Sequence, residues 1–308
     1  MSKQTMRIGI ISNCDLFIPM AYTLANQGLQ VCIFYAPSED PIVHQKVNGF
    51  IQASKLPSRY ETNPADDVYD WLKDTQPETV FVCGYRHLLD VTRFSGVPAY
   101  NIHPGPLPSF RGPSPAFWQL KTGQPTLGFT IHELSSRFDA GKVVWTRSIA
   151  NLPQYHYGMV QQLCSQLCVE GVAIILNALR QLAPFPEIAA TEGTTGAYHK
   201  RPQLKDVLID WGKMDALEIC NLIRACNPWN KGALTVFQGQ EVKLMDGMVT
   251  ELQTAHPPGT IMVRGDGLYI ACAGGKSIKS NMLYMHDGYL PSYHTSIYGL
   301  NHGVRLGS

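Results

Sequence analysis

The sequence predicts an α/β fold, in which a Rossmann-like, mostly parallel sheet is followed by a small OB-like β-barrel. Three observations lead to this prediction. Apolar strand-like runs alternate with amphipathic helix-like segments through residues 7–182. A polar stretch that contains prolines follows at residues 183–213. Short strand-like runs separated by turn residues fill the remainder of the chain.

The first part of the chain alternates strands with helices, which is typical of a parallel sheet covered by helices. Apolar runs predict buried strands, helical spacing predicts helices, and Gly28 is placed to end the first helix. A polar loop is expected after the second strand. The predicted strands are residues 7–12, 29–35, 78–84, 98–102 and 127–134, and the predicted helices are 16–28, 65–75, 157–182 and one that begins at residue 117.

The second part of the chain is expected to be a separate small domain. A helix at residues 214–225 precedes five short strands at a spacing of roughly ten residues, which favours a small barrel of OB type. These strands are predicted at 232–238, 240–246, 258–264, 267–272 and 278–285. The expected boundaries are therefore a catalytic domain at 1–190, a linker at 191–213 and a C-terminal domain at 214–308.

The charge balance argues against a surface built to bind polyanions. The formal net charge is +1, with 15 basic against 15 acidic residues up to residue 200 and 10 against 9 after it. Neither part has the basic excess of a strong nucleic-acid or anionic-membrane binder. We therefore expect no membrane partner, and nucleic acid is disfavoured as a partner.

The eight cysteines favour a reducing compartment, and we expect a cytoplasmic protein. None forms a C-x-x-C pair, so zinc and disulfides are disfavoured, and Cys164 and Cys168 are expected to share a buried helix face. The N-terminus lacks the apolar core of a signal peptide, and no apolar run is expected to approach the length of a membrane span. The first strand is followed by Ser12-Asn13-Cys14-Asp15, which has no glycine-rich dinucleotide or Walker pattern.

A proline-rich segment after the fourth predicted strand carries the clearest chemical signal. Residues 101–115 read NIHPGPLPSFRGPSP, and five prolines exclude both a helix and a strand ladder. Asn101 and His103 are two residues apart at the strand end, so extended backbone directs both to one side. An amide donor beside an imidazole can polarise a carbonyl and move a proton. A histidine that merely caps the loop remains the alternative interpretation.

An acidic residue follows the next predicted strand. Residues 135–141 read SSRFDAG, and Asp139 can approach His103 from this neighbouring loop. A carboxylate beside an imidazole orients the ring and raises its pKa. An ordinary turn aspartate before Gly141 is the alternative.

These motifs together resemble the 10-formyltetrahydrofolate-dependent formyltransferase and hydrolase family. The pattern N-x-H-P-x-x-L-P-x-x-x-G at 101–112, followed by a strand and D-x-G, is similar to its catalytic domain, as are residues 85–89 and 129–144. Residues 222–234 and 258–273 resemble the C-terminal OB-type domain of the methionyl-tRNA branch. YRHLL, IHELSSRFDAG and RACNPWNKGA most resemble the branch that formylates UDP-4-amino-4-deoxy-L-arabinose in polymyxin resistance.

The resemblance implies a cofactor and roles for particular residues. The formyl donor is expected to be 10-formyltetrahydrofolate, with Asn101 stabilising an oxyanion, His103 transferring the proton and Asp139 orienting His103 and raising its pKa. No metal is expected. The residues expected to hold the pterin are His87, Leu88, Leu89, Ser135, Ser136, Arg137, Phe138 and Asp139.

The chain departs from the family pattern beside the expected acceptor pocket. The family often has a Ser-Leu-Leu-Pro run after the histidine, whereas this chain has Pro104-Gly105-Pro106-Leu107-Pro108. Pro113 replaces an arginine that contacts folate in close relatives, which leaves the folate-tail contact open. The residues expected to contact the acceptor are Gly105, Pro106, Phe110 and Arg111, although aromatic side chains in this region could instead pack in the core.

The identity of the acceptor amine stays open at this point. The leading hypothesis is a small-molecule amine on a nucleotide-linked sugar, and the alternative is an amino acid or peptide amine, free or bound to a carrier protein. Methionyl-tRNA is disfavoured because residues 36–55 contain two lysines and two acids rather than a basic cluster. Hydrolysis of the cofactor and pure ligand binding are the remaining alternatives. The sequence does not indicate an oligomeric state.

Overall fold

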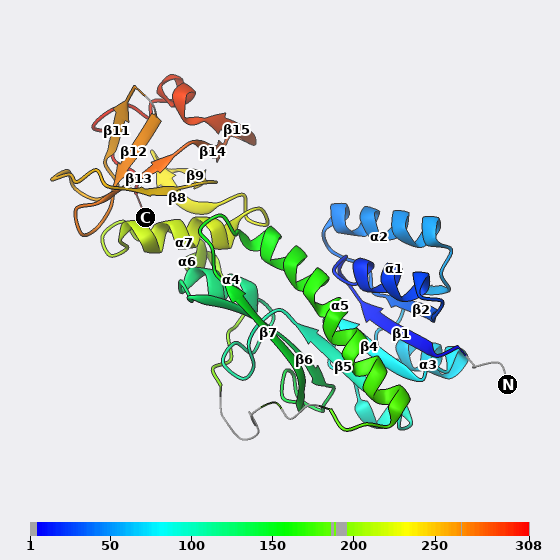
Figure 1. The fold of residues 1–308 in the computed structure, drawn as a ribbon. Coiled ribbons are helices and arrows are strands. Elements are labelled where there is room, and N and C mark those ends of the chain that lie inside the picture. The colour runs from blue at the N-terminus through cyan, green and yellow to red at the C-terminus, as the bar shows by residue number, and fades with distance from the viewer. Residues whose placement is uncertain (1–4, 186–187, 189–195, 266, 308) are drawn as a thin grey trace. The chain divides into compact units, whose positions relative to one another are not determined.

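The computed structural model describes residues 5–185, 188, 196–265 and 267–307, and its contacts divide the chain into two compact units (Figure 1). Unit 1 comprises Met1–Pro115, Gly128–Ile149 and Gln161–His199, and unit 2 comprises Ala116–Leu127, Ala150–Val160 and Lys200–Ser308. Two segments that the sequence places in the first domain, 116–127 and 150–160, thus group with the C-terminal unit. Within the predicted linker 191–213, residues 191–195 lie outside the described residues and Leu204–Val207 form a helix, α6.

Unit 1 is built on one seven-stranded sheet. The order is β3-β2-β1-β4-β5-β6-β7; β1 to β5 run parallel, and β6 is antiparallel to β5. The Rossmann-like, mostly parallel prediction is therefore confirmed. The strands are β1 Arg7–Ser12, β2 Gln30–Tyr35, β3 Ser58–Tyr60, β4 Thr79–Cys83, β5 Ala99–His103, β6 Thr126–Glu133 and β7 Val143–Ala150.

The expected polar loop after β2 instead contains α2 (Pro41–Ser54) and the short strand β3. Asp40 begins this helix because its carboxylate accepts the backbone N–H groups of Ile42 and Val43. Only Val47 and Ile51 of the helix are buried, so its apolar stripe is one turn long. That narrow stripe explains why periodicity missed the helix. The other helical segments are α1 Ile18–Asn26, α3 Asp67–Thr75, η1 Val91–Phe94, α4 Pro115–Lys121 and α5 Tyr157–Gln181.

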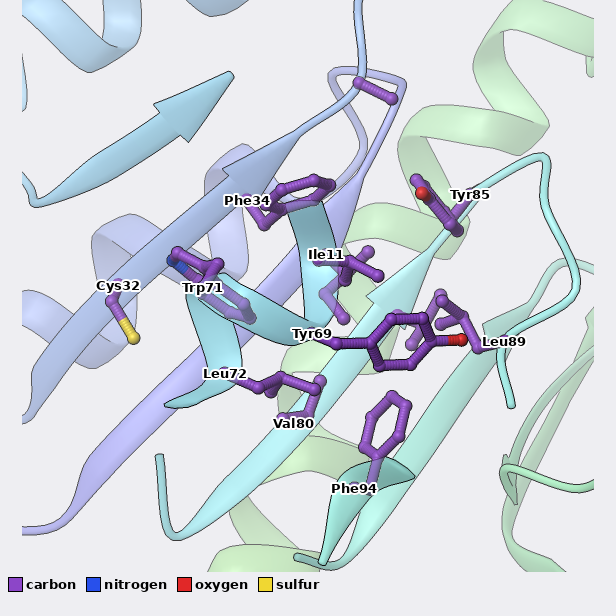
Figure 2. Packing of buried hydrophobic residues seen from close by; sticks show 13 residues of the cluster. Ile11, Cys32, Phe34, Tyr69, Trp71, Leu72, Val80, Tyr85, Leu89 and Phe94 are labelled. Atoms are coloured by element: carbon purple, nitrogen blue, oxygen red, sulfur yellow. The ribbon is translucent and has the colours of Figure 1, made fainter. Parts of the chain in front are cut away.

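A buried cluster on one face of the sheet ties α3 to the central strands (Figure 2). Trp71 and Leu72 of α3 pack there with Phe34 of β2. Tyr85 and Leu89, which follow β4, belong to the same cluster. The core therefore extends past the end of β4 into the loop that the sequence assigns to the cofactor.

Helix α5 is long and apolar enough, by length and composition, to span a membrane. The expectation that no run approaches this length is therefore wrong. A large part of the helix nevertheless packs within unit 1, where a side chain at Gly171 would come within 2.5 Å of Trp145 and 2.8 Å of Ile131. Cys164 and Cys168 share its buried face as predicted, with sulfurs 3.8 Å apart. These features describe a core helix.

Unit 2 contains two four-stranded antiparallel sheets, of order β10-β13-β12-β11 and β15-β14-β9-β8, together with helix α7 (Ala216–Cys226). The expected C-terminal domain of antiparallel strands is confirmed, while the OB-type assignment stays a prediction. Sequence patterns predicted five strands, but the run 278–285 is two strands that change sheets at Asn281, and two short strands were missed. The strands are β8 Ala233–Phe237, β9 Gln240–Leu244, β10 Met248–Thr250, β11 Ile261–Arg264, β12 Gly267–Ala271, β13 Ser277–Ser280, β14 Met282–Met285 and β15 Gly288–Pro291.

Candidate active site

Strands β5 and β6 present the candidate site on one face of the unit 1 sheet. Asn101 and His103 are two residues apart on β5, so their side chains leave the same face. The antiparallel register sets His132 opposite Asn101 and Thr130 opposite His103. The sheet thus gathers two imidazoles and one amide, and His103 and His132 are buried.

Both ring nitrogens of His103 face hydrogen-bond acceptors. Nε2 lies 2.7 Å from the carbonyl oxygen of Phe110, which requires Nε2 to carry a proton and donate it. Nδ1 lies 3.4 Å from Oδ1 of Asp139. Since Nε2 is committed as a donor, Nδ1 is the nitrogen at which this imidazole gains and loses a proton. The predicted approach of Asp139 to His103 is confirmed by this distance.

Asp139 reaches the site because the chain folds back after β6. Its backbone takes the left-handed conformation, with φ of 52°, and its Oδ2 accepts the backbone N–H of Gly112 at 2.8 Å. A side chain at Gly141 would lie 1.7 Å from the carbonyl oxygen of Glu133, and one at Gly112 would lie 2.0 Å from that of His199. The glycines of the D-x-G and R-G motifs are therefore required by close backbone contacts around the carboxylate.

His132 is a member of the site that sequence reasoning missed. Its Nδ1 donates to the carbonyl oxygen of Glu133 at 2.8 Å, so its Nε2 is free to accept from the Asn101 amide at 3.0 Å. Nε2 also lies 3.7 Å from Oδ1 of Asp139. The available signal was the pairing of β5 with β6, because a residue opposite Asn101 must share its face. Among the described residues, no group of three or more His, Cys, Asp or Glu side chains could hold a metal ion.

Burial changes the expected protonation of His103 and Asp139. Desolvation lowers the pKa of His103 below its ordinary value, and the opposing effects of Asp139 and the Phe110 carbonyl do not reverse this. The sequence-based expectation of a raised pKa for His103 is therefore wrong, because it considered the carboxylate and not the burial. Burial alone would raise the pKa of Asp139, but His132, His103 and the Gly112 amide together hold it below its ordinary value. The resting pair is thus a neutral imidazole beside a carboxylate.

Side-chain and backbone bonds hold the proline-rich loop against β6. Thr130 donates its hydroxyl to the carbonyl oxygen of Gly105 at 2.8 Å and accepts the N–H of Leu107 at 3.3 Å. A side chain at Gly105 would lie 2.5 Å from Pro115 and 3.1 Å from Nε2 of His103. The Leu107–Pro108 peptide bond is cis. Gly105 is therefore a place where the loop backbone approaches the imidazole closely.

The residues expected to contact the acceptor lie close together in the loop but differ in what they contact, and Phe110 donates its N–H to the carbonyl oxygen of Pro106 at 3.0 Å. Gly105 lies against His103, whereas Phe110 is only 8% exposed and stacks its ring on His199 at 5.0 Å. The Arg111 carbonyl accepts the N–H of His199 at 2.8 Å. The side-chain Nε of Arg111 is a buried donor with no hydrogen-bond partner among the described residues. Phe110 thus supports the loop by packing, while Arg111 keeps an unused donor.

The loop after β4 offers unpaired backbone groups, as a bound pterin would need. Within the described part of the chain, no backbone hydrogen bond involves residues 86–89, although the next residue, Asp90, donates its N–H to the Tyr69 hydroxyl at 2.8 Å. Leu88 is 50% exposed while Leu89 is buried. Since a pterin edge binds N–H and C=O groups, His87, Leu88 and Leu89 fit the expected cofactor contact.

The second expected cofactor segment runs from Ser135 to Asp139. Ser135 donates its hydroxyl to the carbonyl oxygen of Arg137 at 2.8 Å, which closes a turn, while Ser136 and Arg137 are exposed. Phe138 is 48% exposed, an unusual position for a large apolar ring. The segment therefore has an apolar surface available to a flat ligand directly beside the carboxylate of Asp139, whose side chain is 10% exposed.

Comparison with known proteins assigns the chain to a family. Residues 25–172 match "Formyl transferase", and residues 203–283 match "Formyl transferase, C-terminal domain". Together the two matches cover most of the chain, which therefore belongs to the formyl transferase family. The resemblance inferred from the motifs is confirmed.

Particular relatives differ in what their names say they act on. Methionyl-tRNA formyltransferase of Roseiflexus castenholzii is 30% identical over 212 residues, covering 66% of this chain and 65% of that enzyme. The bifunctional polymyxin resistance protein ArnA of Wigglesworthia glossinidia brevipalpis is 30% identical over 208 residues, covering 66% of this chain and 31% of that protein. The chain thus spans less than two thirds of the length of each.

A solved structure shares the fold over nearly its whole length. The N-formyltransferase of Helicobacter canadensis, in complex with folinic acid and dTDP-3-aminofucose, matches with a TM-score of 0.69 at 13% identity. The match covers 90% of this chain and 99% of that one. At this identity, the similarity shows the fold.

Proposed function

We propose that this protein is an N-formyltransferase that moves the formyl group of 10-formyltetrahydrofolate to a primary amine. The observation that carries the proposal is the cluster of Asn101, His103 and Asp139 on a formyl transferase fold, with Asp139 Oδ1 3.4 Å from His103 Nδ1. The unpaired backbone N–H and C=O groups of residues 86–89 support folate as the proposed cofactor. Folinic acid in the complex of the Helicobacter canadensis enzyme gives further support.

The side chains suit acyl transfer to an amine. The bound cofactor supplies the formyl group. The Asn101 amide nitrogen uses one N–H on His132, which leaves its second N–H to donate to the formyl oxygen as negative charge develops there. His103 can add a second donor from Nε2 by exchanging the Phe110 carbonyl for the formyl oxygen. Its Nδ1 can take the proton that the attacking amine loses, while the Asp139 carboxylate stabilises the imidazolium, and return that proton to N10 of the departing tetrahydrofolate.

We further propose that the acceptor amine belongs to a nucleotide-linked amino sugar. The near-neutral charge of the chain favours a small acceptor over a polyanion. The motif resemblance to the polymyxin-resistance branch and the dTDP-3-aminofucose bound by the Helicobacter canadensis enzyme favour a sugar.

Methionyl-tRNA is the second candidate, because the Roseiflexus castenholzii relative carries that name. Against it, the segment after β2 forms α2, in which Lys46 is the single Lys or Arg residue. Since phosphate contacts dominate nucleic-acid affinity, this helix gives tRNA little to bind. An amino acid or carrier-bound amine remains a hypothesis with no structural observation in its favour.

The test is a transfer assay with 10-formyltetrahydrofolate and a panel of amines. The panel contains UDP- and dTDP-linked 3-amino and 4-amino sugars, methionyl-tRNA and free amino acids, with formylated product detected by mass spectrometry. We expect product with a nucleotide-linked sugar and none with the His103→Gln variant. Product with methionyl-tRNA alone contradicts the sugar acceptor, and formate release without any formylated amine contradicts transferase activity.

A further inference from the structure

A buried carboxylate beside the cofactor loop has no role in the chemistry described so far. Glu61 directly follows β3 and is only 6% exposed. Its backbone N–H donates to the carbonyl oxygen of Tyr35 at 3.0 Å, which fixes it to the sheet. A buried charge costs free energy unless neighbouring groups compensate it. The neighbours of Glu61 therefore indicate what it does.

The polar contacts of this carboxylate are with three consecutive residues that follow β4. Tyr85 donates its hydroxyl to Oε1. The Arg86 guanidinium lies 3.7 Å from Oε2 and the His87 ring nitrogen Nε2 lies 3.8 Å from it. Arg86 also donates from Nε to His87 Nε2 at 3.1 Å. One side chain from the end of β3 thus holds the first half of the loop.

The opposite end of the loop is held separately. Asp90 donates its N–H to the Tyr69 hydroxyl at 2.8 Å, and its carboxylate accepts the N–H of Thr92 at the start of η1. Tyr85 and Tyr69 both lie in the buried cluster of unit 1 (Figure 2). Between these anchors, no backbone hydrogen bond involves residues 86–89 within the described residues. The unpaired groups are therefore held in place before any ligand arrives.

We propose that Glu61 is a positioning residue that presets the loop 85–89 for the folate cofactor. The proposal rests on the proposed use of folate. The carboxylate orients Tyr85, Arg86 and His87, so the backbone of residues 87–89 does not have to be ordered on binding. Oε2 is buried without a hydrogen bond among the described residues, so the Arg86 guanidinium acts on it through charge and not through fixed geometry.

The substitution Glu61→Gln tests this role because it keeps an acceptor for Tyr85 and removes the charge. We expect the Kd for folinic acid, measured by titration calorimetry, and the KM for 10-formyltetrahydrofolate to rise about tenfold, as expected when a loop must be ordered on binding. The KM for the amine should stay unchanged and kcat should stay within about twofold. The control Asp74→Asn removes the exposed Arg59–Asp74 ion pair, which involves β3 itself, and should change none of these values.

Tyr85→Phe is the second variant, used also if the Gln variant does not fold. It removes the hydroxyl bond and leaves the charges, and we expect a smaller rise in the same two constants. Unchanged folinic acid affinity in folded Glu61→Gln or Tyr85→Phe protein overturns the proposal, as does a fall in kcat with unchanged KM for the cofactor. If the unsubstituted protein binds no folinic acid, the proposed function itself fails. If the unsubstituted protein binds and the variants bind equally well, only the role of Glu61 fails.

Discussion

Replacing Asp139 by asparagine separates the chemistry of the site from its stability. The asparagine amide oxygen can still accept the Gly112 N–H, which now lies 2.8 Å from Oδ2. Its amide nitrogen then faces His103 Nδ1, which now lies 3.4 Å from the carboxylate. That N–H donor would satisfy the neutral imidazole and oppose a proton on Nδ1. We therefore expect proton transfer to be suppressed while the fold persists.

The two effects of this substitution differ in size. Positioned proton transfer contributes about 10²- to 10⁴-fold to a rate. We expect kcat/KM to fall by that factor, or about 3–5 kcal/mol in transition-state stabilisation. Replacing a charge-assisted hydrogen bond by a neutral one costs about 1 kcal/mol of folding free energy. The variant should therefore be well folded and nearly inactive.

The assay is the initial rate of formyl transfer, combined with urea unfolding of the same preparation. The matched control is Asp246→Asn, since the Asp246 carboxylate accepts the N–H groups of Asn281 and Met282 at 2.8 and 3.0 Å in unit 2. It should alter stability and leave kcat/KM unchanged. A decrease of less than about tenfold in kcat/KM for Asp139→Asn refutes the role of Nδ1 as the proton acceptor.

Three further predictions concern stability. Gly141→Ala should lower the free energy of unfolding by about 3 kcal/mol, measured with urea, because the new Cβ would lie 1.7 Å from the Glu133 carbonyl oxygen. Gly49→Ala, in helix α2 with no atom within 4 Å of the new Cβ, should cost far less, and equal costs would contradict the contact argument. Folding lowers the pKa of His103, so below the ordinary value of 6.5 the unfolded chain binds a proton that the folded protein resists. The free energy of unfolding should therefore have its full value above pH 6.5 and fall as the pH falls through 6.5. His103→Gln should flatten this slope in thermal unfolding between about pH 7 and 5, and an unchanged slope would assign it to other groups. Trp211→Phe should lower the free energy of unfolding by about 2 kcal/mol because it removes the buried hydrogen bond from Nε1 to Thr235 Oγ1 at 2.9 Å. Trp229→Phe, at a site 46% exposed, should lower it by less. The reverse order in urea unfolding would be contrary to this expectation.

The main features of the unit 1 fold could be predicted because its strands are continuous apolar runs. β1 coincides with its predicted range, and β4 and β5 differ by one residue at each end. α2 was missed because two buried residues one turn apart do not make a periodic pattern. The strands of unit 2 were miscounted because β13 and β14 are adjacent in sequence and separated only by Asn281, which no composition signal marks. The domain boundaries and the cytoplasmic location stay predictions.

The site could be predicted where motif and backbone agree. Asn101, His103 and Asp139 are brought together as expected, since they lie on one strand and on the loop after its neighbour. Two properties required three-dimensional information. His132 follows from strand register, and the lowered pKa of His103 follows from its burial. The assignment of the cofactor and acceptor contacts stays a prediction.

The register of β5 against β6 has a consequence for how such a site could be moved or rebuilt. Because His132 lies directly opposite Asn101, a slip of one residue would turn one of the two side chains to the other face of the sheet. An N-x-H segment grafted alone into another protein would lack the imidazole that holds its amide. The smallest transferable part is the strand pair with both connecting segments. Acceptor preference, in contrast, could diverge through the proline-rich loop while this pair stays unchanged.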